Sequence, residues 1–252
     1  MTTNTARTHT TATGPWRPAM SRDVAMRLAA TEYQRFSAQL QRLSAHDWSR
    51  PTDCPAWDVK AMAGHVTGMA ELSASTLEKA RQLRAAARGD GPLVDVLTAH
   101  QVAKHADDTP EQLVSRFTEI GPKAARGRRR LPALVRRATF EETVGGRTER
   151  WTVGFLVDVI LTRDTWMHRV DIARATGQPL ELSADHDAVL VADVAAEWAR
   201  RHGQPCTLVL TGRAGGRWSW GSGGPTLELD AVDFCRGLSG RGRPALDTEV
   251  PF

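Results

Sequence analysis

The chain has 252 residues, of which 41% are hydrophobic and 25% are charged, and its formal net charge at pH 7 is +4. These values are typical of a soluble globular protein with one large domain or two small ones. Because no run of about 18 apolar residues is present, the sequence predicts no membrane-spanning helix. Three cysteines, Cys54, Cys206 and Cys235, lie far apart without a CxxC motif. This pattern argues against a disulfide framework and favours a cytoplasmic protein.

The excess of positive charge is concentrated in one segment. A run of this kind marks either a solvated helix end or a site for an anionic ligand, and the sequence leaves both interpretations open. Aromatic residues do not alternate with the arginines, so we expect no nucleic-acid partner. The arginines of this segment are Arg126, Arg128, Arg129, Arg130, Arg136 and Arg137.

The first part of the chain predicts a tail followed by two helices. Residues 1–19 are rich in Thr and poor in large apolar side chains, which predicts a disordered tail without a secretory signal. Apolar residues then recur every three or four positions and predict a helix over about 21–45. After a polar loop with two prolines, a second helix is predicted over about 56–88, ended by Gly89.

Two more helices and a hairpin complete this part. Residues 109–112 combine an N-cap Thr, Pro at the first helical position and Gln at the third, and therefore start a helix. That helix is expected to kink or end at Gly121-Pro122. A short hairpin is predicted within 138–150 and a strongly apolar helix over about 153–176. Residues 20–180 thus hold four principal helices, as in a four-helix bundle.

The remainder of the chain changes character. Short β-prone runs separated by glycine clusters follow another helix, and this mixture predicts a small α+β domain over 181–252. The predicted elements are helices over about 185–202 and 230–238 and strands over about 207–211, 217–221 and 226–229.

Two histidines and one aspartate stand on helix faces that are otherwise apolar. His65 lies on the inner face of the second predicted helix, and Asp164 and His168 lie one turn apart on that of the fourth. Burial of such groups without partners is strongly unfavourable, and a shared cation would remove the penalty. Two imidazoles and a carboxylate form a three-ligand set that leaves one position of a catalytic zinc open for water or a thiol.

The same spacing also fits interpretations without a metal. A single histidine on an apolar face is more often a hydrogen-bonded core residue than a ligand. Asp164 and His168 would also form an ion pair at the i,i+4 spacing. In a further alternative, Arg163 or Arg169 would form an ion pair with Asp164. The residue pattern alone does not choose among these interpretations.

Longer segments carry a resemblance to a known family. Asp47–Val59, followed by Gly64–Val66, resembles the N-terminal signature of the mycothiol-dependent maleylpyruvate isomerase family. Arg163–Ala173 is similar to the last-helix signature of that family. Phe234–Arg241 and Val250–Phe252 are similar to its small C-terminal domain. The resemblance covers nearly the whole chain after the tail.

The resemblance implies a mainly α fold, in which a DinB-like metal-binding four-helix bundle at 20–180 precedes the small α+β domain. It also implies a divalent metal, zinc, held by His65, Asp164 and His168. The family isomerase has Glu where this chain has Asp164. Asp is one methylene shorter, so its carboxylate reaches less far from the helix axis, although zinc accepts either carboxylate.

The resemblance further implies an enzyme that uses mycothiol as its nucleophile or cofactor on a small electrophilic substrate. The reaction would be isomerisation of a maleylpyruvate-like substrate or transfer of the thiol sulfur to the substrate. Arg241 is the candidate catalytic residue, because a guanidinium pairs bidentately with the carboxylates of such a diacid. The alternative is a non-catalytic, metal-stabilised module that binds a ligand or partner. Neither alternative predicts a nucleic-acid or membrane partner.

Overall fold

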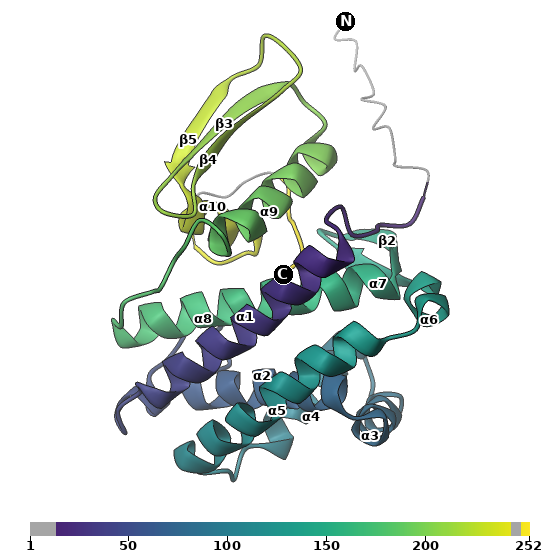
Figure 1. Cartoon of the computed structure of the whole chain (residues 1–252), viewed down its shortest axis with the longest axis vertical. Helices are drawn as coiled ribbons and strands as arrows, with labels where there is room; N and C mark the ends of the chain where they lie inside the picture. Colours follow the sequence, from purple (N-terminus) through teal and green to yellow (C-terminus); the bar gives the residue numbers. More distant parts are fainter. Residues whose placement is uncertain (1–13, 243–247) are drawn as a thin grey trace, which may run out of the picture.

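Four long helices lie side by side, and a small sheet with two further helices sits on one side of them (Figure 1). This computed structural model describes residues 14–242 and 248–252 and has the predicted mainly α fold with a small C-terminal sheet. Residues 1–13 of the predicted tail lie outside the described residues. None of the described helices is both long and apolar enough to span a membrane. The four helices of the bundle are α1 (Arg22–Gln41), α2 (Val59–Ala74), α5 (Pro110–Arg130) and α8 (Leu161–Thr176).

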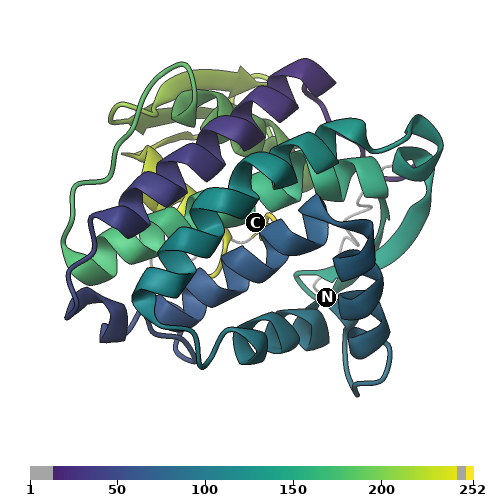
Figure 2. The same cartoon turned by 60° about the horizontal axis from the view of Figure 1, so that its bottom comes forward.

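The four helices associate because each buries one apolar stripe against the others. Phe36 of α1, Val66 of α2, Phe117 of α5 and Ile172 of α8 meet in one core and are fully buried. Burial of a side chain of this size contributes about 1.5–3 kcal/mol. α5 begins at the predicted capping box on Thr109. Figure 2 shows α1, α5 and α2 as successive neighbours, with α8 behind them.

The predicted single helix over 56–88 is wrong, because the chain breaks into α2 and α3 (Thr76–Ala86). Ser75 between them is extended, with φ −132° and ψ 128°, and its hydroxyl caps the first turn of α3. The break lies where α5 crosses the end of α2. The crossing is so close that a Cβ on Gly127 would lie 2.0 Å from the carbonyl oxygen of Ser73.

A further helix, α4 (Leu93–Lys104), packs on α2 and α3 and has no counterpart among the predicted elements. Buried amides make part of this contact. Gln101 Nε2 donates to Gln82 Oε1 (3.0 Å), and Gln82 Nε2 donates to the carbonyl oxygen of Gly68 (3.0 Å). Because these buried groups are polar, α4 leaves only a weak apolar periodicity in the sequence.

The chain between α5 and α8 forms the predicted hairpin. α5 continues through Gly121-Pro122 instead of ending there. Gly145 and Gly146 have φ values of 55° and 73°, the positive values that a two-residue hairpin turn requires. The backbone N–H of Trp16 donates to the carbonyl oxygen of Arg150 (2.7 Å), so part of the predicted tail is attached to this hairpin. The elements of this region are α6 (Ala133–Arg137) and the antiparallel strands β1 (Thr139–Val144) and β2 (Arg147–Thr152).

The predicted helix over 153–176 contains a π turn before α8 begins. The buried guanidinium of Arg128 reaches this turn from α5, and its Nε donates to the carbonyl oxygen of Val157 (2.8 Å). This hydrogen bond ties the start of α8 to the bundle. Gly177, with φ 72°, ends α8 as predicted. The segments before α8 are α7 (Val153–Phe155) and the π turn η2 (Leu156–Ile160).

The C-terminal part packs on the opposite face of α8. Its core combines Trp198 and Phe234 with Trp166 and Met167 of α8 and Leu28 of α1. α8 is therefore buried between the bundle and the C-terminal part. In the sheet the strand order is β4-β3-β5, with β3 antiparallel to β4 and parallel to β5. The elements are α9 (Asp187–His202), β3 (Cys206–Thr211), β4 (Gly216–Trp220), β5 (Thr226–Asp230) and α10 (Ala231–Leu238).

Buried ion pairs hold α8 to its neighbours. Arg163 contacts Glu197 of α9 (2.8 Å). Arg169 contacts Glu32 of α1 (2.7 Å) and Asp187 of α9 (2.7 Å). Removing one member of such a pair would leave an uncompensated buried charge, which is strongly destabilising. Both arginines that flank the predicted site in sequence are thus engaged elsewhere.

Candidate functional site

His65, Asp164 and His168 come together where α2 faces α8. His65 Nε2 lies 3.6 Å from Asp164 Oδ1, and His168 Nε2 lies 3.3 Å from the same oxygen. The two imidazole rings are 5.3 Å apart and nearly perpendicular. Both histidines are buried, and the Asp164 side chain is 18% exposed. The second and fourth predicted helices therefore bring the three residues into one cluster.

The spacing of these atoms fits a shared metal ion. Two ligand atoms that each lie about 2.0–2.1 Å from a tetrahedral ion are separated by roughly 3.3 Å. The observed separations are close to this value and longer than an ordinary hydrogen bond. Asp164 Oδ2 is buried and has no hydrogen-bond partner among the described residues. The donor set and this orphaned carboxylate oxygen thus suit a divalent cation.

The arginine interpretation of Asp164 does not hold. Arg163 and Arg169 form their ion pairs with acidic residues of α1 and α9, as described above. Among the described residues, the ion-pair partners of Asp164 are His65 and His168. The carboxylate therefore faces the two imidazoles.

Asp164 and His168 stabilise each other's charged forms. Burial alone lowers the pKa of His168, but the carboxylates of Asp164 and Asp171 outweigh burial and raise this pKa to about 9. Burial raises the pKa of Asp164, but His168 and His65 outweigh burial and hold that pKa well below its ordinary value. A carboxylate in this environment is ionised and requires a neighbouring positive charge.

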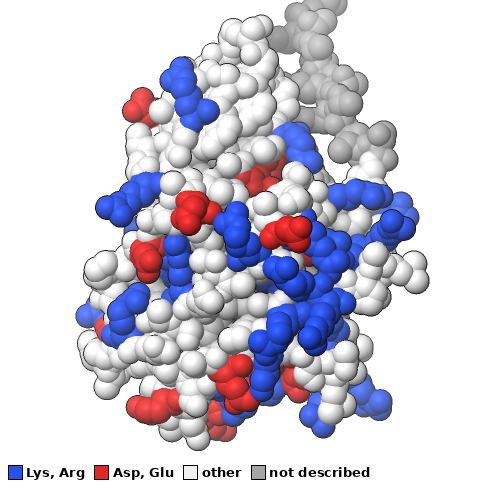
Figure 3. All heavy atoms as spheres, viewed as in Figure 1, with Lys and Arg blue, Asp and Glu red and all other residues white. Residues whose placement is uncertain are grey.

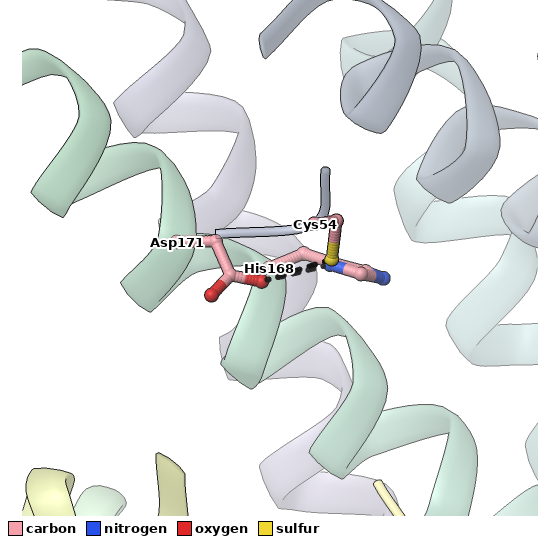
Figure 4. A group of neighbouring side chains, drawn as sticks. All are labelled: Cys54, His168 and Asp171. Carbon is pink, nitrogen blue, oxygen red and sulfur yellow. Dashed lines mark hydrogen bonds and ion pairs between the residues drawn. The ribbon is translucent and has the colours of Figure 1, made fainter. Parts of the chain in front are cut away.

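Asp171 orients His168 from the far side of the ring. Its side chain is fully buried, and its Oδ2 lies 3.3 Å from His168 Nδ1 (Figure 4). A histidine that donates from Nδ1 to a carboxylate keeps its Nε2 lone pair free for a metal. The same Oδ2 accepts a hydrogen bond from Arg241 Nε (2.9 Å). No sequence pattern assigns a role to Asp171, although its position three residues after His168 places it beside the imidazole.

Cys54 belongs to a second group of potential ligands. Its Sγ, a ring nitrogen of His168 and a carboxylate oxygen of Asp171 all lie within 4.8 Å of one another. Figure 4 shows the three side chains pointing toward one another. Arg241 already supplies a cation there, because its Nη2 lies 3.4 Å from the sulfur. Burial raises the pKa of the Cys54 thiol, while Arg241 opposes this effect. These contacts favour the cluster around Asp164 as the metal site and leave Cys54 as a neighbouring thiol.

Trp57 lies on the loop that precedes α2, and its ring packs over both histidines. Its ring centroid lies 5.1 Å from that of His65 and 5.7 Å from that of His168. This loop follows the 3-10 turn η1 (Asp47–Ser49) and is held by Asp53, whose Oδ2 accepts from Arg236 of α10 (2.8 Å). A large aromatic ring at this place limits the access of water to the imidazoles.

Arg241 reaches the site from the segment after α10. Its Nε donates to Asp171, and its side chain is only 16% exposed. Burial lowers the pKa of the Arg241 guanidinium, but Asp171 outweighs burial and raises it, so the group stays charged. The Asp171 carboxylate therefore links Arg241, the predicted substrate-binding residue, to His168.

Replacing Asp171 with Asn is expected to weaken zinc binding about 10- to 100-fold, because the amide is a poorer acceptor for the imidazole N–H. The measurement is a competition titration against a chromophoric zinc chelator. Asp107→Asn is the matched control, since Asp107 is exposed and lies outside the cluster. Equal zinc affinity in the two variants would remove Asp171 from the support of the site.

Comparisons with known proteins relate this geometry to a family. The comparison with curated proteins gives no match. Crystal structures of the mycothiol-dependent maleylpyruvate isomerase and of its histidine-to-alanine mutant are similar in fold. Each has a TM-score of 0.57 and 17% sequence identity, covering 88% of this chain and 90% of that one. The family described as Mycothiol maleylpyruvate isomerase N-terminal domain matches residues 29–173, more than half of the chain. The chain therefore belongs to the mycothiol maleylpyruvate isomerase family.

Proposed function

We propose that this protein is a metal-dependent enzyme that uses mycothiol as nucleophile or cofactor on a small electrophilic carboxylate. The observation that carries the proposal is the convergence of His65, Asp164 and His168 on one point, with Arg241 beside them. Membership of the family supports the thiol and the reaction class. Isomerisation of a maleylpyruvate-like substrate and transfer of the thiol sulfur are the two reactions that fit.

The metal ligands in this proposal are His65 Nε2, His168 Nε2 and a carboxylate oxygen of Asp164. Zinc bound by such a set supplies Lewis acidity, which lowers the pKa of a thiol at its open position toward neutrality. Asp171 fixes the orientation of the His168 ring. Trp57 shields both imidazoles from bulk water.

Arg241 binds the substrate in this proposal. Asp171 holds the guanidinium through Nε. Among the described residues, one terminal nitrogen donates to Cys54 Sγ (3.4 Å), and the other makes a long contact to the carbonyl oxygen of Ser239 (3.5 Å). These nitrogens are suited to a substrate carboxylate, which a guanidinium binds through two parallel hydrogen bonds. The carboxylate would then sit close to the thiol-binding position.

The test is incubation of the zinc-loaded protein with mycothiol, maleylpyruvate and a panel of electrophiles, followed by mass spectrometry and NMR. A mass-neutral change of geometry indicates an isomerase, and a stable thiol adduct indicates a transferase. No conversion of any substrate would refute the enzyme proposal and favour a metal-stabilised binding module.

Arg241→Met is expected to lower kcat/KM for a dicarboxylate at least about 30-fold, since loss of a charged hydrogen-bonding partner costs roughly 2 kcal/mol or more. An uncharged electrophile should react equally well with the variant and the parent. Arg147→Met, in the exposed hairpin, is the matched control. An equal loss for charged and uncharged substrates would contradict the role of Arg241 in carboxylate binding.

A further inference from the structure

A groove of about 430 Å³ lies between the start of α3 and the second half of α5. Four basic residues line it, and no acidic residue does. Figure 3 shows Lys and Arg side chains gathered over the second half of α5. The proposed enzyme function uses none of these groups. The basic residues of the groove are Lys79, Lys123, Arg126 and Arg130.

Three of these cations have no carboxylate partner within the described part of the chain. Lys123 pairs with Glu119 on the same helix (2.5 Å). Lys79, Arg126 and Arg130 form no ion pair with any described residue. Several cations that face one groove repel one another, and an anion bound between them would remove this repulsion.

Helix dipoles do not account for the whole cluster. Arg126 and Arg130 lie near the C-terminal end of α5, where positive side chains are favourable. Lys79 is the fourth residue of α3, close to the positive end of that helix, where a cation is unfavourable. The helix to which it belongs therefore does not favour Lys79 at this place, whereas an anion in the groove would.

Backbone contacts hold the two walls of the groove together. Gly127 packs against the carbonyl oxygen of Ser73 with no room for a side chain, so α5 and the end of α2 cannot separate without losing this contact. Arg22 donates to the carbonyl oxygens of Arg129 and, at 3.0 Å, of Leu131, which fixes the end of α5. A preorganised site binds its ligand with little loss of conformational entropy.

Two exposed apolar residues lie within two positions of residues that line the groove. Leu134 is 81% exposed and Leu77 is 59% exposed, the two highest values among the large apolar residues described. Leu77 follows Thr76, and Leu134 lies two residues after Pro132; both Thr76 and Pro132 line the groove. The surface therefore presents a cationic groove with apolar side chains beside it.

We propose that this groove binds a phosphate group. Guanidinium groups recognise phosphate through paired, charge-assisted hydrogen bonds, and Lys adds a point charge. The phosphate belongs either to a soluble phosphorylated molecule or to the headgroup of an anionic lipid, whose chains would meet Leu77 and Leu134. This inference does not rest on the proposed reaction, because none of the metal-site residues lines the groove.

The first experiment is calorimetric titration of the full chain with inorganic pyrophosphate at low ionic strength. Arg126→Glu and Arg130→Glu are each expected to raise Kd at least about tenfold, as the loss of a charged hydrogen-bonding partner predicts. Arg84→Glu is the control, with the same change of net charge on an exposed part of α3 outside the groove. It should change Kd less than about twofold. Thermal denaturation without ligand verifies that each variant is folded.

The second experiment distinguishes the two sources of phosphate by sedimentation with vesicles of phosphatidylcholine, with and without phosphatidylglycerol. Leu134→Ser should reduce binding to the anionic vesicles and leave pyrophosphate binding unchanged if the ligand is a lipid. Pyrophosphate binding without vesicle binding supports a soluble ligand. Binding of neither probe, or an equal loss in Arg84→Glu and the groove variants, overturns the proposal.

Discussion

His168→Ala is expected to bind zinc at least about 100-fold more weakly than the parent chain. The variant would lose one of the three proposed ligands, namely the imidazole that Asp171 holds in place. Loss of a supporting hydrogen bond alone weakens metal sites about 10- to 100-fold, and loss of a ligand is more severe. The parent should retain close to one divalent ion per chain after dialysis, and the variant should lose most of it. Elemental analysis of both proteins gives the stoichiometry.

The control for this substitution is His46→Ala, because His46 is exposed and caps no helix with its side chain. Circular dichroism verifies that the His168 variant remains helical. Full metal content in a folded His168→Ala protein would show that His168 is not a ligand. Equal loss in His46→Ala would show that the loss does not come from the site.

The second large effect concerns Asp164, where this chain departs from the family. Asp164→Asn should lose zinc, because a neutral amide oxygen is a poor zinc donor and the local negative charge disappears. Asp164→Glu should retain zinc, because it restores the ligand of the family isomerase at the same helical position. The measurement combines metal stoichiometry with the increase in Tm that saturating zinc produces in each protein.

The competing explanation makes Asp164 only an ion-pair partner of the two histidines. Under that explanation Asp164→Asn would lower stability but would leave the metal content unchanged. Asp107→Asn controls for the loss of one carboxylate elsewhere. Full zinc occupancy in Asp164→Asn would remove Asp164 from the ligand set, and the two histidines would be too few for the proposed chemistry.

Much of the site could be predicted from local pattern. His65, Asp164 and His168 interrupt apolar stripes at helical spacing, and burial of such groups requires partners. The spacing alone did not decide whether Asp164 faces a metal, a histidine or a neighbouring arginine. Only the fold shows that Arg163 and Arg169 pair with other helices.

The contacts that complete the site connect distant parts of the sequence. Arg241 and Cys54 are 187 residues apart, yet Nη2 lies 3.4 Å from the sulfur. No periodicity or motif relates such positions, because the contact depends on how the segment after α10 packs beside α8. The break between α2 and α3 at Ser75 could not be predicted from the local sequence either, because it depends on the crossing of α5 at Gly127.

The most direct test of the account is anomalous diffraction at the zinc absorption edge from crystals of the zinc-loaded protein. One strong peak is expected between His65 Nε2, His168 Nε2 and the Asp164 carboxylate. A peak between Cys54 Sγ, His168 Nδ1 and Asp171 would contradict it, because Arg241 supplies the cation there in this structure. Absence of any peak near His168 in a protein that contains zinc would contradict it as well.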